Sequence, residues 1–80
     1  MLNQRDKILV ELLKSKRVEQ NIKQIELSAK LCKTQSYVSK YENNERKLSF
    51  IETIDICNAI GINLNSLYIE LMEKFHESHC

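Results

Sequence analysis

The chain of 80 residues contains no proline, no tryptophan and only one glycine, Gly61. Proline and glycine mark most turns and linkers, so their scarcity predicts a single domain covering residues 1–80. No apolar stretch approaches the roughly 20 residues that a membrane-spanning helix needs. The N-terminal sequence MLNQRDK lacks the apolar run and cleavage site of a secretory signal. We therefore expect no membrane partner and a cytoplasmic location.

The three cysteines, Cys32, Cys57 and Cys80, lie far apart and form no Cys-x-x-Cys pair. This spacing indicates neither a disulfide framework nor a zinc finger. His76, His79 and Cys80 have a helical spacing that could bind a metal. Chain ends are usually poorly ordered, so we interpret this group as a solvated tail and expect no metal and no cofactor.

The formal net charge of +1 conceals two halves of opposite sign. Residues 1–48 contain eleven Lys or Arg and six Asp or Glu, a balance of +5, whereas residues 49–80 contain one Lys and five acids, a balance of −4. A near-neutral total argues against a nucleic-acid partner, but a basic half can still provide one positively charged face. An ordinary solvated helix surface explains the same numbers, so charge alone does not separate these interpretations.

Apolar residues recur every three or four positions along the chain, which predicts helices and no strands. The expected helices cover about residues 5–20, 24–31, 35–42, 50–60 and the segment from 64 onward. Their apolar residues are Leu9, Leu12, Leu13, Ile25, Leu27, Leu31, Val38, Tyr41, Ile54, Cys57, Ile60, Leu64, Leu67, Tyr68, Leu71, Met72 and Phe75, and those of the first four helices are expected to face the core. Five short helices make an all-α domain.

Capping signals mark several of these helix ends. Asn21 is typical of a left-handed stop after the first helix. Ser49 followed by Glu52 is a capping box, the clearest local signal in the chain. Gly61 ends the fourth helix, and Asn63 can cap the fifth.

Residues 24–42 form the most informative segment. They predict two short helices joined by a turn of Cys32, Lys33 and Thr34, and the Thr34 hydroxyl can cap the second helix. The second helix carries small polar side chains on one face. This is the layout of a helix-turn-helix, in which the second helix lies in the DNA major groove.

Four polar side chains of the second helix lie opposite its apolar residues by helical spacing. We expect them to contact DNA bases: Gln35, Ser36, Ser39 and Lys40. Gln can pair with adenine, Lys can reach guanine, and Ser tolerates several bases. Gln35 and Ser36 are the main candidates because the helix N-terminus enters the groove first, whereas Lys40 contacts a base or a phosphate. A plain hydrophilic surface is the alternative interpretation.

Polar and basic residues around this helix are candidates for DNA phosphate contacts. They are Gln24, Lys33, Thr34, Tyr37, Asn43, Arg46 and Lys47. Gln24 opens the first helix of the motif, where its amide and the helix N-terminus can bind a phosphate. The ring of Tyr37 could equally pack on the domain surface with its hydroxyl at the backbone.

About two-thirds of the chain, from Arg17 through Tyr68, resembles the Xre-type (Cro/cI-like) helix-turn-helix domain. The matching residues, in order, are Arg17, Gln24, Leu27, Leu31, Thr34, Gln35, Ser36, Val38, Ser39, Glu42, Asn43, Glu45, Arg46, Ser49, Ile60 and Gly61. The resemblance implies a five-helix, lambda-repressor-like fold and double-stranded DNA as partner. It also implies a bacterial or phage-encoded protein that is nucleoid-associated when bound to DNA, and an ion pair between Arg17 and Glu42.

Several positions depart from the family pattern. Cys32 replaces the usual turn glycine, so this turn is either strained or different in shape, because a Cβ is disfavoured at positive φ. Asn44 also replaces a glycine, and Asn tolerates left-handed geometry well. Lys23 stands where Ser or Thr usually caps the helix. These changes lower the expected stability more than the expected function.

The last helix and tail, residues 64–80, carry more apolar surface than so small a core requires. We expect Ile69, Met72 and Phe75 to form a two-fold dimer contact, since exposed apolar patches often mark association surfaces. The alternative is that these residues fold back on the first helix.

The sequence thus favours a homodimeric, sequence-specific transcriptional regulator that binds a palindromic operator. The chain size and last helix resemble controller proteins of restriction–modification systems, so control of such genes is one expectation. An antitoxin-like or phage-type repressor whose main role is to bind a partner protein is the alternative. We expect no enzyme activity because no nucleophile–base pair is present. We expect no small-molecule ligand because five short helices leave no room for a pocket of a few hundred Å³.

Overall fold

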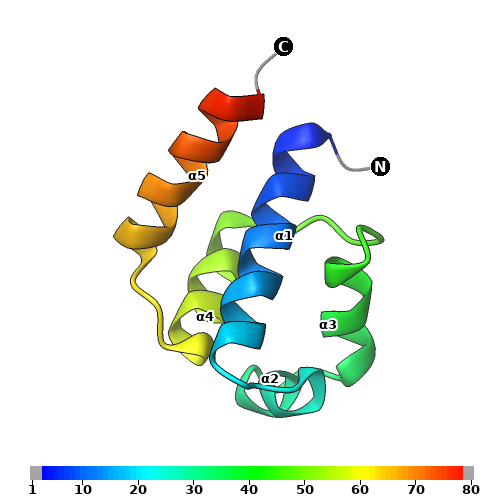
Figure 1. The fold of residues 1–80 in the computed structure, drawn as a ribbon. Helices are drawn as coiled ribbons and strands as arrows, with labels where there is room; N and C mark the ends of the chain where they lie inside the picture. Colours follow the sequence, from blue (N-terminus) through cyan, green and yellow to red (C-terminus); the bar gives the residue numbers. More distant parts are fainter. Residues whose placement is uncertain (1–2, 79–80) are drawn as a thin grey trace.

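The computed structural model describes residues 3–78, which form five α-helices and no strand (Figure 1). The helices are α1 (Gln4–Glu19), α2 (Gln24–Lys30), α3 (Gln35–Glu42), α4 (Phe50–Ile60) and α5 (Leu64–Ser78). In Figure 1, α1 runs between α3 on one side and α5 on the other, while α2 closes one end. The expected all-α, five-helix fold is confirmed. Within the described range, no helix combines the length and apolarity that a membrane span requires.

The helix ends show most of the expected caps. The Ser49 hydroxyl accepts the Glu52 N–H at 3.1 Å, and the Glu52 carboxylate accepts the Ser49 N–H at 2.8 Å. Asn63 accepts the Asn65 N–H at 2.7 Å at the start of α5. Lys23 has no side-chain acceptor, so α2 is capped only by Glu26, whose carboxylate accepts the Lys23 N–H at 2.9 Å.

Every helix contributes to one hydrophobic core. Its buried members are Val10, Leu12, Leu13, Leu27, Val38, Tyr41, Leu48, Ile56, Cys57, Ile60 and Leu67. Tyr41 is fully buried, and its hydroxyl has no hydrogen-bond partner among the described residues. Burial raises the pKa of this hydroxyl, which therefore stays protonated.

Two expected core residues were assigned wrongly. Ile25 is 59% exposed on the outer side of α2. Ile54 is only half-buried, because α4 turns Thr53, Ile56, Cys57 and Ile60 inward instead. These four follow helical spacing, and Thr53 is tolerated in the core because its hydroxyl donates to the Ser49 carbonyl at 2.9 Å.

Within residues 3–78, three residues other than glycine adopt left-handed backbone conformations at turns. They are Asn21 (φ 59°), Cys32 (φ 56°) and Asn44 (φ 63°). Asn visits this region readily, but a cysteine does so rarely. The turn between α2 and α3 is therefore strained at Cys32, while Gly61 (φ 84°) ends α4 without strain.

We predict that Cys32→Gly stabilises the domain by about 1 kcal/mol, because glycine adopts the left-handed conformation without a steric penalty. Urea unfolding followed by circular dichroism measures the change. Cys32→Ala is the matched control: it also removes the exposed thiol but keeps the Cβ, so it should bring no gain. An equal gain in both variants would show that the thiol, not the backbone, limits stability.

Candidate DNA-binding surface

The two helices of the predicted motif pack against each other across the turn at residues 31–34. The Lys33 N–H donates to the Ser28 carbonyl at 2.9 Å and closes the end of α2. The Thr34 hydroxyl then accepts the Tyr37 N–H at 3.2 Å and caps α3. Val38 and Tyr41 anchor α3 because both are fully buried. The opposite face of α3 consequently points to solvent.

The four expected base-contacting residues share this outer face of α3. Gln35, Ser36 and Lys40 are exposed, and Ser39 is half-buried. The Ser39 hydroxyl accepts a hydrogen bond of 3.3 Å from the Asn43 side-chain amide. The side chains of Gln35, Ser36 and Lys40 form no hydrogen bond or ion pair with any described residue. Their contact with bases stays a prediction.

A buried polar network fixes the far end of α3. The Glu42 carboxylate, whose side chain is fully buried, accepts from Arg17 Nε at 2.7 Å and from Arg17 Nη2 at 3.0 Å. Arg17 Nη1 also donates to the Ile22 carbonyl at 2.6 Å. Gln24 Nε2 donates to Glu42 Oε1 at 2.9 Å. The network joins α1, the start of α2 and the end of α3.

This geometry changes how Gln24 can act. Its side chain is half-buried, and one amide proton already binds Glu42. An amide carries two donor protons and one acceptor oxygen, so only the remaining proton and the α2 N-terminus are available for a phosphate. Gln24 thus combines a structural contact with its predicted phosphate contact.

Tyr37 lies at the centre of a second polar cluster. Its hydroxyl donates to Glu52 Oε2 at 3.1 Å, rather than to the backbone. The guanidinium of Arg46 lies 5.0 Å from the ring centroid, and the ammonium of Lys33 lies 5.5 Å from it. Arg46 Nη2 also donates to Glu52 Oε2 at 2.5 Å. The sequence identified Glu52 only as a capping residue and gave no signal for these contacts.

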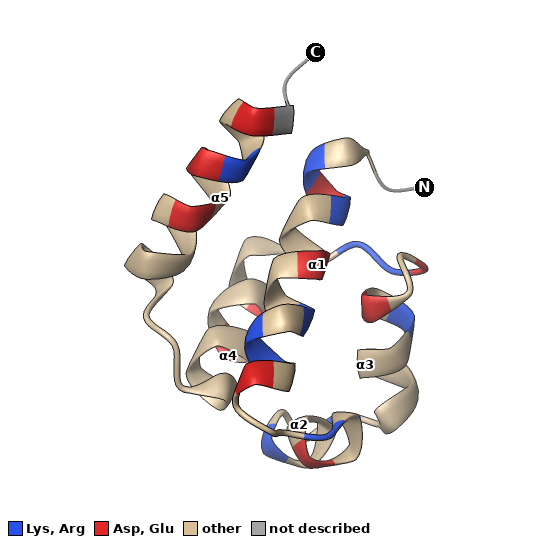
Figure 2. Cartoon of the chain, viewed as in Figure 1, with Lys and Arg blue, Asp and Glu red and all other residues tan. Residues whose placement is uncertain are grey.

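The other predicted phosphate contacts are exposed. Lys33, Thr34, Asn43, Arg46 and Lys47 flank α3 at its two ends. Lys47 lies 4.0 Å from Asp6, a contact too long and too exposed to hold it firmly. Figure 2 shows basic residues on the loop after α3, while α5 carries Glu70, Glu73 and Glu77.

The expected dimer residues differ in exposure. Ile69 is 53% exposed and Met72 is 45% exposed. Phe75 is half-buried, and the guanidinium of Arg5 on α1 lies 5.2 Å from its ring centroid. Phe75 therefore packs partly against α1, as the alternative interpretation states. Tyr68 on α5 and Phe50 and Ile51 in the first turn of α4 are further large exposed apolar side chains.

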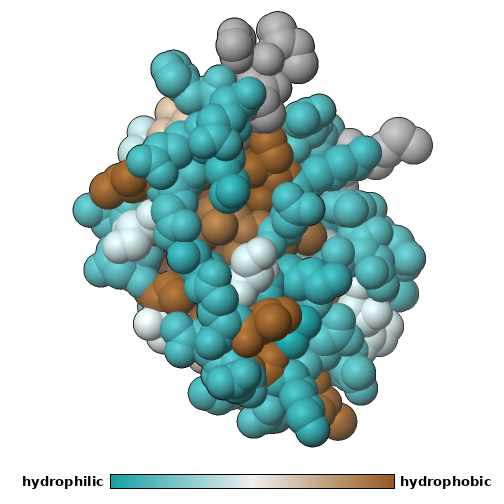
Figure 3. Space-filling view, viewed as in Figure 1, coloured by the Kyte–Doolittle hydropathy of each residue, from teal (hydrophilic) through white to brown (hydrophobic). Residues whose placement is uncertain are grey.

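An apolar groove separates α1 and α4 from α5, and apolar side chains show in the seam between α1 and α5 in Figure 3. It has a volume of about 530 Å³ and is lined by Leu9, Leu48, Phe50, Thr53, Leu64, Asn65, Leu67, Tyr68 and Leu71. The expectation that five helices leave no room for such a volume was wrong. The groove is open because α5 contacts the remainder of the domain mainly through α1.

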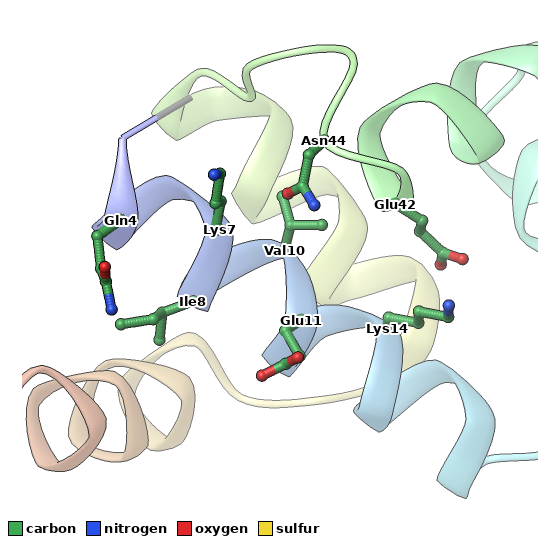
Figure 4. A pocket seen from close by; sticks show the side chains of 8 residues that line it. All are labelled: Gln4, Lys7, Ile8, Val10, Glu11, Lys14, Glu42 and Asn44. Atoms are coloured by element: carbon green, nitrogen blue, oxygen red, sulfur yellow. The ribbon is translucent and has the colours of Figure 1, made fainter. Parts of the chain in front are cut away.

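A second hollow of about 390 Å³ lies between α1 and the residues that follow α3 (Figure 4). Lys7, Val10 and Lys14 face it from α1, opposite Asn44 and Glu42. Its lining mixes both charges, so it offers no single-sign site for an ion. His79 and Cys80 of the possible metal cluster lie outside the described residues, and no group of three metal-ligating residues occurs among those described.

We predict that Glu42→Ala lowers the free energy of unfolding by about 3–5 kcal/mol, because it leaves the buried Arg17 guanidinium without its charged partner. The loss should appear as a much lower melting temperature together with weaker DNA binding. Glu42→Gln keeps the shape and one acceptor oxygen, so it should lose less stability. Glu45→Ala, in the exposed loop, is the control and should melt like the wild type. An unchanged melting temperature with collapsed affinity would show instead that Glu42 touches DNA.

The comparisons with known proteins agree with this architecture. A family model described as helix-turn-helix matches residues 13–67. An XRE-family like protein from Pseudomonas syringae pv. tomato str. DC3000 is 41% identical, with 88% of this chain and 85% of that chain covered and a TM-score of 0.83. None of the curated proteins matches the chain.

Two further solved structures share the fold at low identity. The wild-type restriction–modification controller protein C.Esp1396I is 19% identical, with 92% of this chain and 97% of that chain covered and a TM-score of 0.86. The clp gene regulator ClgR from C. glutamicum is 20% identical, with 91% and 95% covered and a TM-score of 0.80. With the helix-turn-helix of α2 and α3 in place, the chain belongs to the Xre family of helix-turn-helix, DNA-binding transcriptional regulators.

Proposed function

We propose that the protein acts as a homodimer that binds a palindromic DNA operator through α3. The observation that carries this proposal is the outer face of α3, where polar side chains are exposed while Val38, Tyr41 and Glu42 anchor the opposite face. In related docking geometries such a helix enters the major groove, and two copies about 34 Å apart fill successive grooves. Gln35, Ser36, Ser39 and Lys40 then contact bases.

Phosphate contacts on both sides of α3 would supply most of the affinity. Lys33 and Thr34 lie before its first turn, and Asn43, Arg46 and Lys47 follow its last turn. Each phosphate that the protein neutralises releases counterions, so binding should weaken steeply with salt. Gln24 would add further phosphate contacts, through its remaining amide proton and through the N-terminus of α2.

The exposed apolar residues of α5 support the homodimer. Ile69 and Met72 adjoin Tyr68 on one face of α5. Phe75, the third residue expected in this contact, is half-buried and packs partly against α1. An exposed apolar patch of this kind is costly in an isolated domain and often marks an association surface. A two-fold contact there would place two α3 helices in one symmetric unit, as a palindromic site requires.

Occupancy of the operator is the mechanism we propose for regulation. Repression follows where the operator overlaps a promoter, and activation follows where a surface of the bound protein touches the polymerase. C.Esp1396I is a restriction–modification controller and shares the fold, so restriction–modification genes are the first class of target to examine. The second candidate function is an antitoxin-like or phage-type repressor that mainly binds a partner protein, and the same exposed face of α5 favours it.

Selection of bound duplexes from a random-sequence pool at near-physiological salt tests the proposal. We expect the wild type to enrich a palindrome whose half-sites lie about one helical turn apart. Ile69→Glu should disrupt the dimer and bind the same palindrome far more weakly, whereas Val18→Glu, an exposed apolar position on α1, should behave like the wild type. Sedimentation equilibrium reports the oligomeric state of all three proteins.

Two results would contradict the proposal. A wild type that stays monomeric, and enriches no sequence, would move the partner-binding function to first place. A dimer that survives Ile69→Glu would place the association surface elsewhere on the domain.

A further inference from the structure

Three other chain segments approach Tyr37, which lies in the first turn of α3. Arg46 from the loop after α3 and Lys33 from the turn before it bring their cations to 5.0 Å and 5.5 Å from the ring centroid. Glu52 from α4 accepts the Tyr37 hydroxyl at 3.1 Å and Arg46 Nη2 at 2.5 Å, both on Oε2. One carboxylate oxygen therefore fixes both the ring and the cation that lies against it.

The Glu52 carboxylate is itself held firmly. Its other oxygen, Oε1, accepts the Ser49 N–H at 2.8 Å as part of the α4 capping box. This backbone hydrogen bond, followed by those from Arg46 and Tyr37, lowers the pKa of Glu52 to about 2 against the opposing effect of burial. Glu52 is consequently ionised at neutral pH. Burial and the bond to Glu52 raise the pKa of Tyr37, which keeps its donor proton.

Arg46 remains open to a further ligand in this arrangement. Its side chain is 44% exposed, whereas that of Glu52 is 21% exposed. The guanidinium carries five N–H donors in a flat fork, and the contact with Glu52 engages Nη2. The donors that face solvent are therefore held in one orientation. A free arginine would have to lose its rotamer freedom on binding, at a cost that an ordered arginine avoids.

We propose that Glu52 is a positioning residue for DNA binding: its carboxylate holds Arg46 against the Tyr37 ring so that the guanidinium presents its free donors to a DNA phosphate beside α3. This inference rests on the proposed function, because it takes the face of α3 as the DNA-binding surface. It assigns the Glu52 carboxylate a second task besides capping α4, and it makes Tyr37 the platform for a phosphate-binding cation.

If Glu52 positions Arg46, neutralising its carboxylate should weaken DNA binding. An acid that only lies near DNA should have the opposite effect. A carboxylate repels phosphates, so its neutralisation should strengthen binding. Glu45 provides that comparison within the same loop as Arg46. It is exposed, and its carboxylate has no hydrogen bond or ion pair with any described residue. The direction of the change in affinity therefore separates a positioning role from simple repulsion.

The experiment measures dissociation constants over a range of salt concentrations for five proteins: wild type, Glu52→Gln, Glu45→Gln, Arg46→Ala and the double variant Arg46→Ala with Glu52→Gln. Gln retains an acceptor for the Ser49 N–H, so Glu52→Gln preserves the helix cap. Circular dichroism confirms that each variant is folded at the temperature used. The probe is the operator duplex selected by the wild type, or a random-sequence duplex at low salt if none is selected, since phosphate contacts are independent of sequence.

We expect Glu52→Gln to weaken binding roughly three- to tenfold, the cost of ordering one arginine side chain. Glu45→Gln should not weaken binding. Arg46→Ala should weaken binding and lower the slope of log affinity against log salt by about one phosphate contact. In the double variant, Glu52→Gln should add no further loss, because its effect passes through Arg46.

Stronger or unchanged binding by Glu52→Gln would overturn the inference while leaving the proposed function intact. An equal loss of affinity from Glu52→Gln in the wild type and in the Arg46→Ala variant would also overturn the inference. Glu52 would then act on DNA binding without Arg46. Failure of the wild type to bind either probe would overturn both the proposed function and the inference.

Discussion

The Glu42 carboxylate is the contact on which the DNA-binding half of the domain depends. It is buried, and it binds Arg17 from α1 and Gln24 from α2 at once. A buried charge is tolerable only when it is paired and hydrogen-bonded, so these three side chains must stay together in the folded state. Their joint geometry fixes the angle between α1, α2 and α3. The outer face of α3 is presented in one orientation as a result.

A second cluster, around Tyr37, fixes the orientation of α3 at its N-terminal end. Tyr37 packs edge-on against buried Tyr41, with their ring centroids 5.7 Å apart, and carries Arg46 and Lys33 beside it. Glu52 joins this cluster to the cap of α4. The left-handed backbone conformation of Cys32 directs the chain from α2 into α3, and this conformation is strained for a residue with a Cβ. Rigid placement of polar groups, rather than a deep pocket, is what this surface offers to a ligand.

The fold was predictable because its signals are local. Helical periodicity, the Ser49–Glu52 capping box and Gly61 gave five helices close to their observed limits. Local patterns failed where tertiary packing decides. Ile25 and Ile54 have the right chemistry for a core but lie on the wrong faces, while Thr53 is buried because its hydroxyl bonds to the backbone. The role of Glu52 beside Tyr37 and Arg46 depends on residues that approach only after folding, so no spacing in the sequence could indicate it.

NMR titration of isotope-labelled protein with an operator duplex tests most directly whether the outer face of α3 contacts DNA. We expect the largest shifts at Gln35, Ser36 and Lys40, with further shifts at Lys33 and Arg46. Ile69 and Met72 should shift little if the dimer is already formed before DNA binds. Shifts concentrated on α5, with α3 unperturbed, would show that α3 does not bind DNA.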